Sequence, residues 1–182
     1  MPEIETLDLE LHSIGGGYRS LTEFLGRRIL LIFLQFDCPH SQRLLPAVAG
    51  LAPNPSGGTP APIIISTGPY RAIRDQARAL DIRCPVFIQD DDEASIRFSI
   101  YGTPSASLFD EHGLMLGRAV TGAASVLALA GIMPGPDWTS AATKMRGAGD
   151  YLFALLEAQA SRGDPMRVEP RDLKSTPGAR TG

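Results

Sequence analysis

With 182 residues, 43% of them hydrophobic and 20% charged, the chain has the size and composition of one ordinary globular domain and not of a disordered or fibrous protein. A net charge of -3 provides no basic field for a phosphate backbone, and the longest apolar run, residues 29–36, is far shorter than the roughly 20 residues of a membrane helix. We therefore expect no nucleic acid partner and no membrane insertion.

The start of the chain is acidic, with Glu3, Glu5, Asp8 and Glu10 where a secretory signal would have basic residues and an apolar run. This predicts a cytoplasmic protein. Two cysteines, Cys38 and Cys84, are too few for a disulfide framework or a four-thiolate zinc site, and no histidine has the spacing of a metal ligand. We expect no bound metal and no bound cofactor.

Residues 4–11, where apolar and polar side chains alternate, are predicted to form an edge strand or hairpin, and glycines 15–17 then break the pattern and predict a turn. Ser20 and Glu23 have the spacing of a capping box at the start of a short helical turn. Residues 29–36 are apolar on both faces, which predicts a central strand with helices on both sides.

From Pro39 onward the pattern is helical, and Pro46 is predicted to kink that helix. The remaining elements are predicted as strands at 63–65 and 85–88, helices beginning near 67–69 and in the acidic run 90–93, a hairpin of strands 105–109 and 114–120, and a helix at 123–130. Strands and helices that alternate first, with an antiparallel pair later, predict an α/β fold with a mixed central sheet.

Composition divides the chain after this helix. Residues 1–132 form the predicted domain, and residues 133–162 follow as a helical extension with an apolar face at Leu152, Leu155 and Leu156. Residues 163–182 contain few large apolar groups, which cannot offset the entropy of ordering, so they predict a disordered tail.

The residue that best suits chemistry is Cys38, which stands between a buried strand and a helix. Unpaired backbone N–H groups at a helix start lower the pKa of a thiol, and the thiolate is the nucleophile. His40 could lower that pKa further through a hydrogen bond or a positive charge, or could simply be a solvated residue. The alternative for Cys38 is a buried cysteine that acts as a small hydrophobe.

Two segments carry a family resemblance. The run LLIFLQFDCPHSQRLLPAVAGL resembles the active-site segment of the TlpA-like and MauD-like thiol-disulfide oxidoreductases, and GTPSASLFDEHGLMLGRAVTGAASVLALAG resembles their second half. The resemblance covers about residues 7–131 and implies a thioredoxin-like three-layer fold. It also implies that Pro104 is the cis-proline facing Cys38, and that Pro39, Pro104 and the backbone of Thr103 position the substrate. Pro85 is a rival for the cis-proline, but no hairpin and helix follow it.

The sequence departs from that family where its second active-site cysteine belongs, because Ser41 stands there in a Cys-Pro-His-Ser motif. A serine hydroxyl can hydrogen-bond a thiolate but cannot close a disulfide. Three alternatives remain open. Cys38 could act alone with glutathione or a protein disulfide, Cys84 could resolve it from elsewhere if the two Cα atoms lie within about 7 Å, or the fold could be a redox-inactive protein-binding module.

A further family with this fold, the peroxiredoxins, has a threonine or serine three residues before its single attacking cysteine. Gln35 stands there, which argues against a peroxidase. The preferred interpretation is a monothiol enzyme for thiol-disulfide exchange, with Cys38 attacking, Ser41 and His40 tuning it, and a protein thiol or disulfide or glutathione as partner. The sequence does not indicate an oligomeric state.

Overall fold

The computed structural model describes residues 6–132. Its elements are β1 (Glu10–Ser13), β2 (Tyr18–Ser20), the 3-10 helix η1 (Leu21–Phe24), β3 (Ile29–Leu34), α1 (Pro39–Gln42), α2 (Leu45–Ala49), β4 (Ala61–Ser66), α3 (Tyr70–Ala79), β5 (Val86–Ile88), α4 (Glu93–Arg97), β6 (Ser105–Phe109), β7 (Met115–Thr121) and α5 (Ala123–Leu129). The predicted helical extension and tail lie outside the described residues. Within 6–132, no helix is both long and apolar enough to cross a bilayer.

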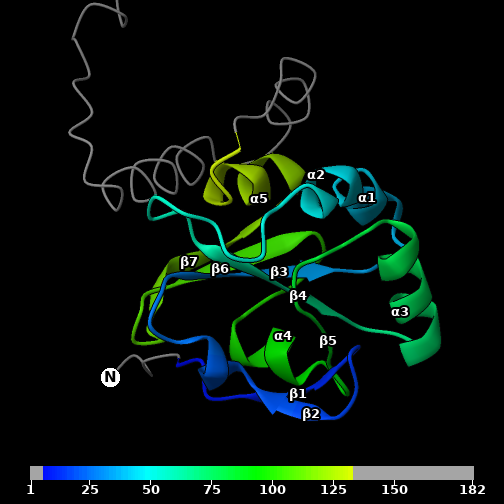
Figure 1. Ribbon diagram of the computed structural model, residues 1–182, viewed down its shortest axis with the longest axis horizontal. Coiled ribbons are helices and arrows are strands. Elements are labelled where there is room, and N and C mark those ends of the chain that lie inside the picture. Colours follow the sequence, from blue (N-terminus) through cyan, green and yellow to red (C-terminus); the bar gives the residue numbers. More distant parts are fainter. Residues whose placement is uncertain (1–5, 133–182) are drawn as a thin grey trace, which may run out of the picture.

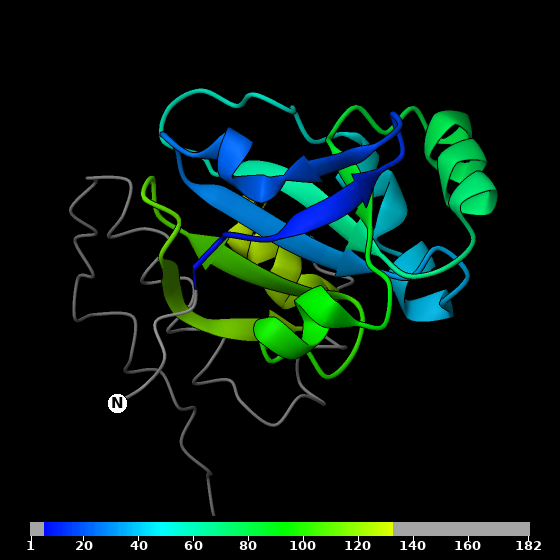
Figure 2. The ribbon, with the colours of Figure 1, turned by 90° about the horizontal axis from the view of Figure 1, so that it is seen from below.

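The strands form one mixed sheet in the order β2-β1-β5-β4-β3-β6-β7 (Figure 1). The strands β3, β4 and β5 are parallel, and β6 and β7 extend the sheet in antiparallel fashion beyond β3. Figure 2 shows the blue N-terminal hairpin and the yellow-green end of the sheet at opposite edges. Parallel neighbours need long crossovers whereas antiparallel neighbours need only a turn, so this order confirms the predicted mixed α/β architecture.

The N-terminal strand is placed differently from the prediction. Among the described residues it lies at Glu10–Ser13 and residues 7–9 are outside it, and the glycines form the turn of the β1–β2 hairpin. Gly16 and Gly17 have φ of 107° and 74°, which a tight turn requires and which favours glycine. The alternation of apolar residues predicted a longer strand because Leu7 and Leu11 are both buried. Only Leu11 belongs to a strand.

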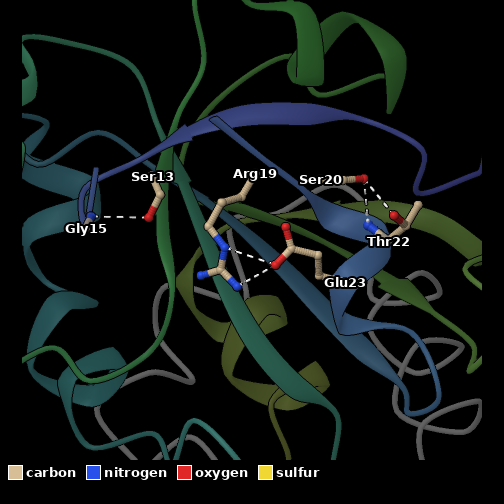
Figure 3. Close-up of polar contacts among 6 residues, drawn as sticks. All are labelled: Ser13, Gly15, Arg19, Ser20, Thr22 and Glu23. Atoms are coloured by element: carbon tan, nitrogen blue, oxygen red, sulfur yellow. Dashed lines mark hydrogen bonds and ion pairs between the residues drawn. The ribbon is translucent and has the colours of Figure 1, made fainter. Parts of the chain in front are cut away.

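The predicted capping box is half formed (Figure 3). The Ser20 hydroxyl accepts a hydrogen bond from the backbone N–H of Thr22 at 3.2 Å and so caps η1. The carboxylate of Glu23 instead pairs with the guanidinium of Arg19 at 2.6 Å. Glu23 therefore forms an ion pair with Arg19, which lies one turn away, instead of accepting a hydrogen bond from the backbone N–H of Ser20.

The central strand β3 supplies two separate cores, because all six of its residues are buried and successive side chains point to opposite faces. Leu30, Ile32 and Leu34 pack into a cluster with residues from α2, α3 and α5, while the residues that alternate with them, Ile29, Leu31 and Phe33, pack with residues from η1 and α4. In Figure 1, α1, α2 and α5 accordingly lie on one side of the sheet and α4 on the other. This confirms the predicted three layers.

The helix that follows β3 is divided into α1 and α2, which are separated by Arg43 and Leu44. Pro46 has no N–H to donate to the carbonyl of Gln42, so the helical hydrogen-bond ladder is interrupted just before it. The break that Pro46 predicts is thus present. It leaves α1 as a single turn that begins next to Cys38.

Helices α3, α4 and α5 share one kind of C-terminus. Two positions after its last residue, each helix is followed by a residue with left-handed backbone, namely Asp81, Ser99 and Gly131, with φ of 53°, 54° and 77°. In α4 the N–H of Ile100 then donates to the carbonyl of Ser95 at 2.8 Å, which closes the turn. This turn sends the chain directly into the segment before β6.

Candidate active site

The candidate site lies at the edge of the sheet where β3 ends and β6 begins. Phe33 pairs with Ser105 in antiparallel register, so the residues just after β3 and just before β6 meet there. Cys38 follows β3 after a turn in which its N–H donates to the carbonyl of Gln35 at 3.0 Å. Pro104 precedes β6, it is buried, and its peptide bond with Thr103 is cis.

The Cys38 sulfur sits among hydrogen-bond donors at the start of α1. Cys38 is the N-cap residue, with extended backbone, and its side chain is partly exposed. The backbone N–H of Ser41 does most to hold the pKa of Cys38 below its ordinary value, and the backbone N–H of His40 adds to it, whereas partial desolvation opposes them. A helix start offers these N–H groups because they have no partner within the helix.

Two hydroxyl groups also lower the pKa of Cys38, those of Ser41 and Thr103. Ser41 is fully buried, and its oxygen accepts a hydrogen bond from the N–H of Gln35 at 3.3 Å, which leaves its proton available to the thiolate. Thr103 belongs to the segment that carries the cis-proline. Donors from two distant parts of the chain therefore converge on one sulfur.

The other residues of the motif are exposed. Pro39 occupies the first turn of α1, where a missing N–H costs nothing, and His40 and Asp37 face solvent. His40 acts on the sulfur through its backbone N–H. Within residues 6–132 no group of three or more His, Cys, Asp or Glu side chains could hold a metal ion.

Known proteins similar to this chain were found by comparing structures and not by comparing sequences. No protein-family model matches the chain, and no curated protein matches its sequence. Among solved structures, the chain is similar to a secreted Mycobacterium tuberculosis disulfide oxidoreductase homologous to E. coli DsbE, with TM-score 0.56 and 18% identity over 69% of this chain and 93% of that one. The fold is thioredoxin-like.

Two further thioredoxin-like structures agree with this assignment. A putative thioredoxin from Neisseria meningitidis gives TM-score 0.57 at 15% identity and covers 81% of this chain and 93% of its own. The bacterioferritin comigratory protein of Xanthomonas campestris, whose structures concern alkyl peroxide reduction, gives TM-score 0.59 at 18% identity over 71% and 93%. At sequence identities this low, the comparisons support the fold of the chain alone.

The second cysteine lies far from the first in this thioredoxin-like fold. Ile32 pairs with Ile64, and Ile64 with Val86, so Cys84 precedes the level of Ile32 whereas Cys38 lies beyond the end of β3. The offset from Cys84 to the end of β3 is already about four residues, or about 13 Å along the strand direction. This exceeds the Cα separation of about 7 Å that a disulfide allows. The register therefore argues against Cys84 as the resolving cysteine, and both thiols are free.

The surroundings of Cys84 fit a core residue. Its side chain is 4% exposed, and its thiol donates to the carbonyl of Leu51 at 3.5 Å. Burial raises the pKa of the Cys84 thiol to about 11. It is therefore a neutral thiol near pH 7, of the kind that reacts slowly.

Sequence reasoning missed two features of this thioredoxin-like site. It assigned only the backbone of Thr103 a role, whereas the side-chain hydroxyl also reaches the sulfur. It did not single out Tyr101, which is 94% exposed just before the cis-proline segment. A threonine beside the expected cis-proline could have suggested the first, but no sequence pattern distinguishes an exposed tyrosine from a buried one.

Proposed function

We propose that the protein carries out thiol-disulfide exchange as a monothiol enzyme, with Cys38 as its single attacking cysteine. The observation that carries the proposal is the convergence of two backbone N–H groups and two hydroxyls on a partly exposed sulfur, which lowers its pKa. A lower pKa increases the thiolate fraction near neutral pH, and the thiolate is the species that attacks a disulfide.

In the proposed step the Cys38 thiolate attacks one sulfur of a partner disulfide. The new bond joins Cys38 to that sulfur, the original sulfur-sulfur bond breaks, and the other sulfur leaves as a thiolate that takes a proton from water. No net oxidation occurs. The donors that stabilise the Cys38 thiolate do the same when Cys38 is the leaving group, so they favour both directions of exchange.

The segment before β6 is suited to hold the partner in place. Neither the N–H nor the C=O of Thr103 has a hydrogen-bond partner among residues 6–132, and Thr103 lies beside the sulfur. An extended peptide that brings its own cysteine to Cys38 could pair with these groups as an added strand does. Pro39 and Pro104 would flank that peptide on either side of the sulfur.

The serine at position 41 determines the fate of the mixed disulfide. A mixed disulfide at Cys38 has no neighbouring thiol to release it, because Ser41 cannot form a disulfide and Cys84 lies at the other end of the sheet. Release then needs a thiol from outside, such as glutathione or a second protein thiol. The expected product is a mixed disulfide that persists until such a thiol arrives.

A redox-inactive binding module is the competing candidate, and the same missing cysteine favours it. The rate of alkylation of native protein by iodoacetamide between pH 5 and 10 separates the two. Monothiol chemistry predicts a half-maximal rate below the pH of about 8.5 that is typical of a free cysteine, together with one mixed disulfide per chain after treatment with oxidised glutathione. The variant C38S should form none, and C84S should behave like wild type. A profile centred above pH 9 would favour the binding module.

A further inference from the structure

The most exposed large hydrophobic side chain of residues 6–132 belongs to Tyr101, which stands two residues before Thr103. It is 94% exposed, and the second most exposed, Ile96 at 73%, lies in α4 at the start of the same connection. Tyr18 and Tyr70 each use their hydroxyl in a hydrogen bond and pack their ring against His12. Within the described chain, no hydrogen bond or aromatic contact involves Tyr101.

The segment that carries Tyr101 is anchored on both sides. Before it, the bond from Ile100 N–H to the Ser95 carbonyl closes the end of α4, and the side chain of Ile100 is buried. After it, the hydroxyl of Ser105 donates to the carbonyl of Gly102 at 2.6 Å, and Pro104 is buried. The exposure of Tyr101 is thus imposed by a fixed backbone and does not result from a loose loop.

Tyr101 is also close to the reactive sulfur. Ser105 pairs with Phe33, and the N–H of Cys38 donates to the carbonyl of Gln35, so the segment before β6 lies beside the turn that holds Cys38. Thr103 belongs to that segment and is two residues from Tyr101, so the two Cα atoms lie within about 7 Å. A substrate whose sulfur meets Cys38 therefore passes this ring when it extends along the segment before β6. A ring that stands out from a rigid backbone loses little conformational entropy when it is covered.

We propose that Tyr101 forms an apolar contact surface for the residues that flank the reacting sulfur of a polypeptide disulfide. The inference rests on the proposed function and specifies its substrate class. A polypeptide can present an apolar side chain a few residues from its cysteine, whereas glutathione carries none that would cover an aromatic ring. Tyrosine is among the residues that most often dominate binding at protein interfaces.

The test compares Y101A with Y18A, a matched control that removes another exposed tyrosine. Tyr18 lies on β2, four strand positions from β3, or about 19 Å across the sheet. The substrates are two cysteine peptides activated as mixed disulfides with a nitrothiobenzoate group, one with leucine and phenylalanine beside the cysteine and one with glycine and serine. Oxidised glutathione is the third substrate, and the readout is the second-order rate of exchange.

Wild type and Y18A should react with the apolar peptide about tenfold faster than with the polar one, a difference typical of one aromatic contact. Y101A should lose that preference and keep the wild-type rate with oxidised glutathione. An unchanged preference in Y101A, or an equal loss of rate with all three substrates, would overturn the proposal.

A second measurement separates this proposal from the proposed function. The apolar peptide with serine in place of its cysteine cannot exchange, so its equilibrium binding reports the contact surface alone. If the peptide binds Y101A more weakly than Y18A, the result supports the contact surface. This holds even if wild type reacts with no disulfide, although that lack of reaction would reject monothiol exchange. Equal binding to both variants, like unchanged exchange preferences, contradicts the role of Tyr101.

Discussion

Replacing Ser41 with cysteine should convert the site into one that closes its own disulfide. Positions 38 and 41 span the first turn of α1, where the N–H of Gln42 donates to the carbonyl of Cys38 at 2.9 Å, so their Cα atoms have helical spacing of about 5 Å. This lies inside the range that a disulfide accepts. The four-residue ring corresponds to about 2 kcal/mol of stabilisation in the chain-entropy model.

The substitution also carries a cost. The Ser41 oxygen accepts the N–H of Gln35 at 3.3 Å, and a sulfur is a poorer acceptor, so reduced S41C should be about 1 kcal/mol less stable than wild type. Thermal unfolding and intact mass, measured with and without reductant, test both figures. Oxidised S41C should melt above its reduced form and lose its mixed disulfide with glutathione, whereas S41A should show neither effect. A mixed disulfide that persists in S41C, or equal melting of its two forms, would refute the geometry.

Three other changes have effects that the same structure predicts. S41A removes a hydroxyl that lowers the pKa of Cys38, so alkylation at pH 7 should slow about two- to fivefold, and an unchanged rate would contradict this. Burial raises the pKa of Cys84 to about 11. An unfolded cysteine ionises near pH 8.5, so the folded state keeps its proton and the free energy of unfolding should fall between about pH 8.5 and 11. Urea unfolding of C84A should lack this part of the slope. Ser99 has left-handed backbone, with φ 54°, which glycine adopts with less strain. S99G should therefore raise the free energy of unfolding, measured from the urea midpoint, by about 0.5–1 kcal/mol, whereas S99A should not.

Much of the fold can be predicted from the sequence because the pattern of apolar residues indicates which strands and helices are buried. The run 29–36 is apolar on both faces, which only a strand between two helical layers explains, and the structure buries all of β3. The hairpin of β6 and β7 and the break at Pro46 have equally local causes. The prediction of the N-terminal strand failed because Leu7 is buried by tertiary packing from irregular backbone, which looks like strand alternation in the sequence.

The site was harder to predict because it joins segments that are distant in the chain. The position of Cys38 between a strand and a helix predicts its reactivity. The presence of the Thr103 hydroxyl near its sulfur, however, depends on the pairing of β3 with β6. The separation of Cys84 from Cys38 depends on the register of three strands, which no spacing in the sequence encodes. Exposure of Tyr101 likewise depends on how the turn after α4 is closed.

The alternation along β3 makes the length of that strand a functional property. Deletion of any one of its six residues would exchange the side chains that face the two cores and would draw Cys38 about 3.3 Å toward the sheet. The sulfur would then move away from the hydroxyl of Thr103 even if every residue of the motif were kept. Conservative substitutions within this strand are therefore far safer for protein engineering than any change in its residue count.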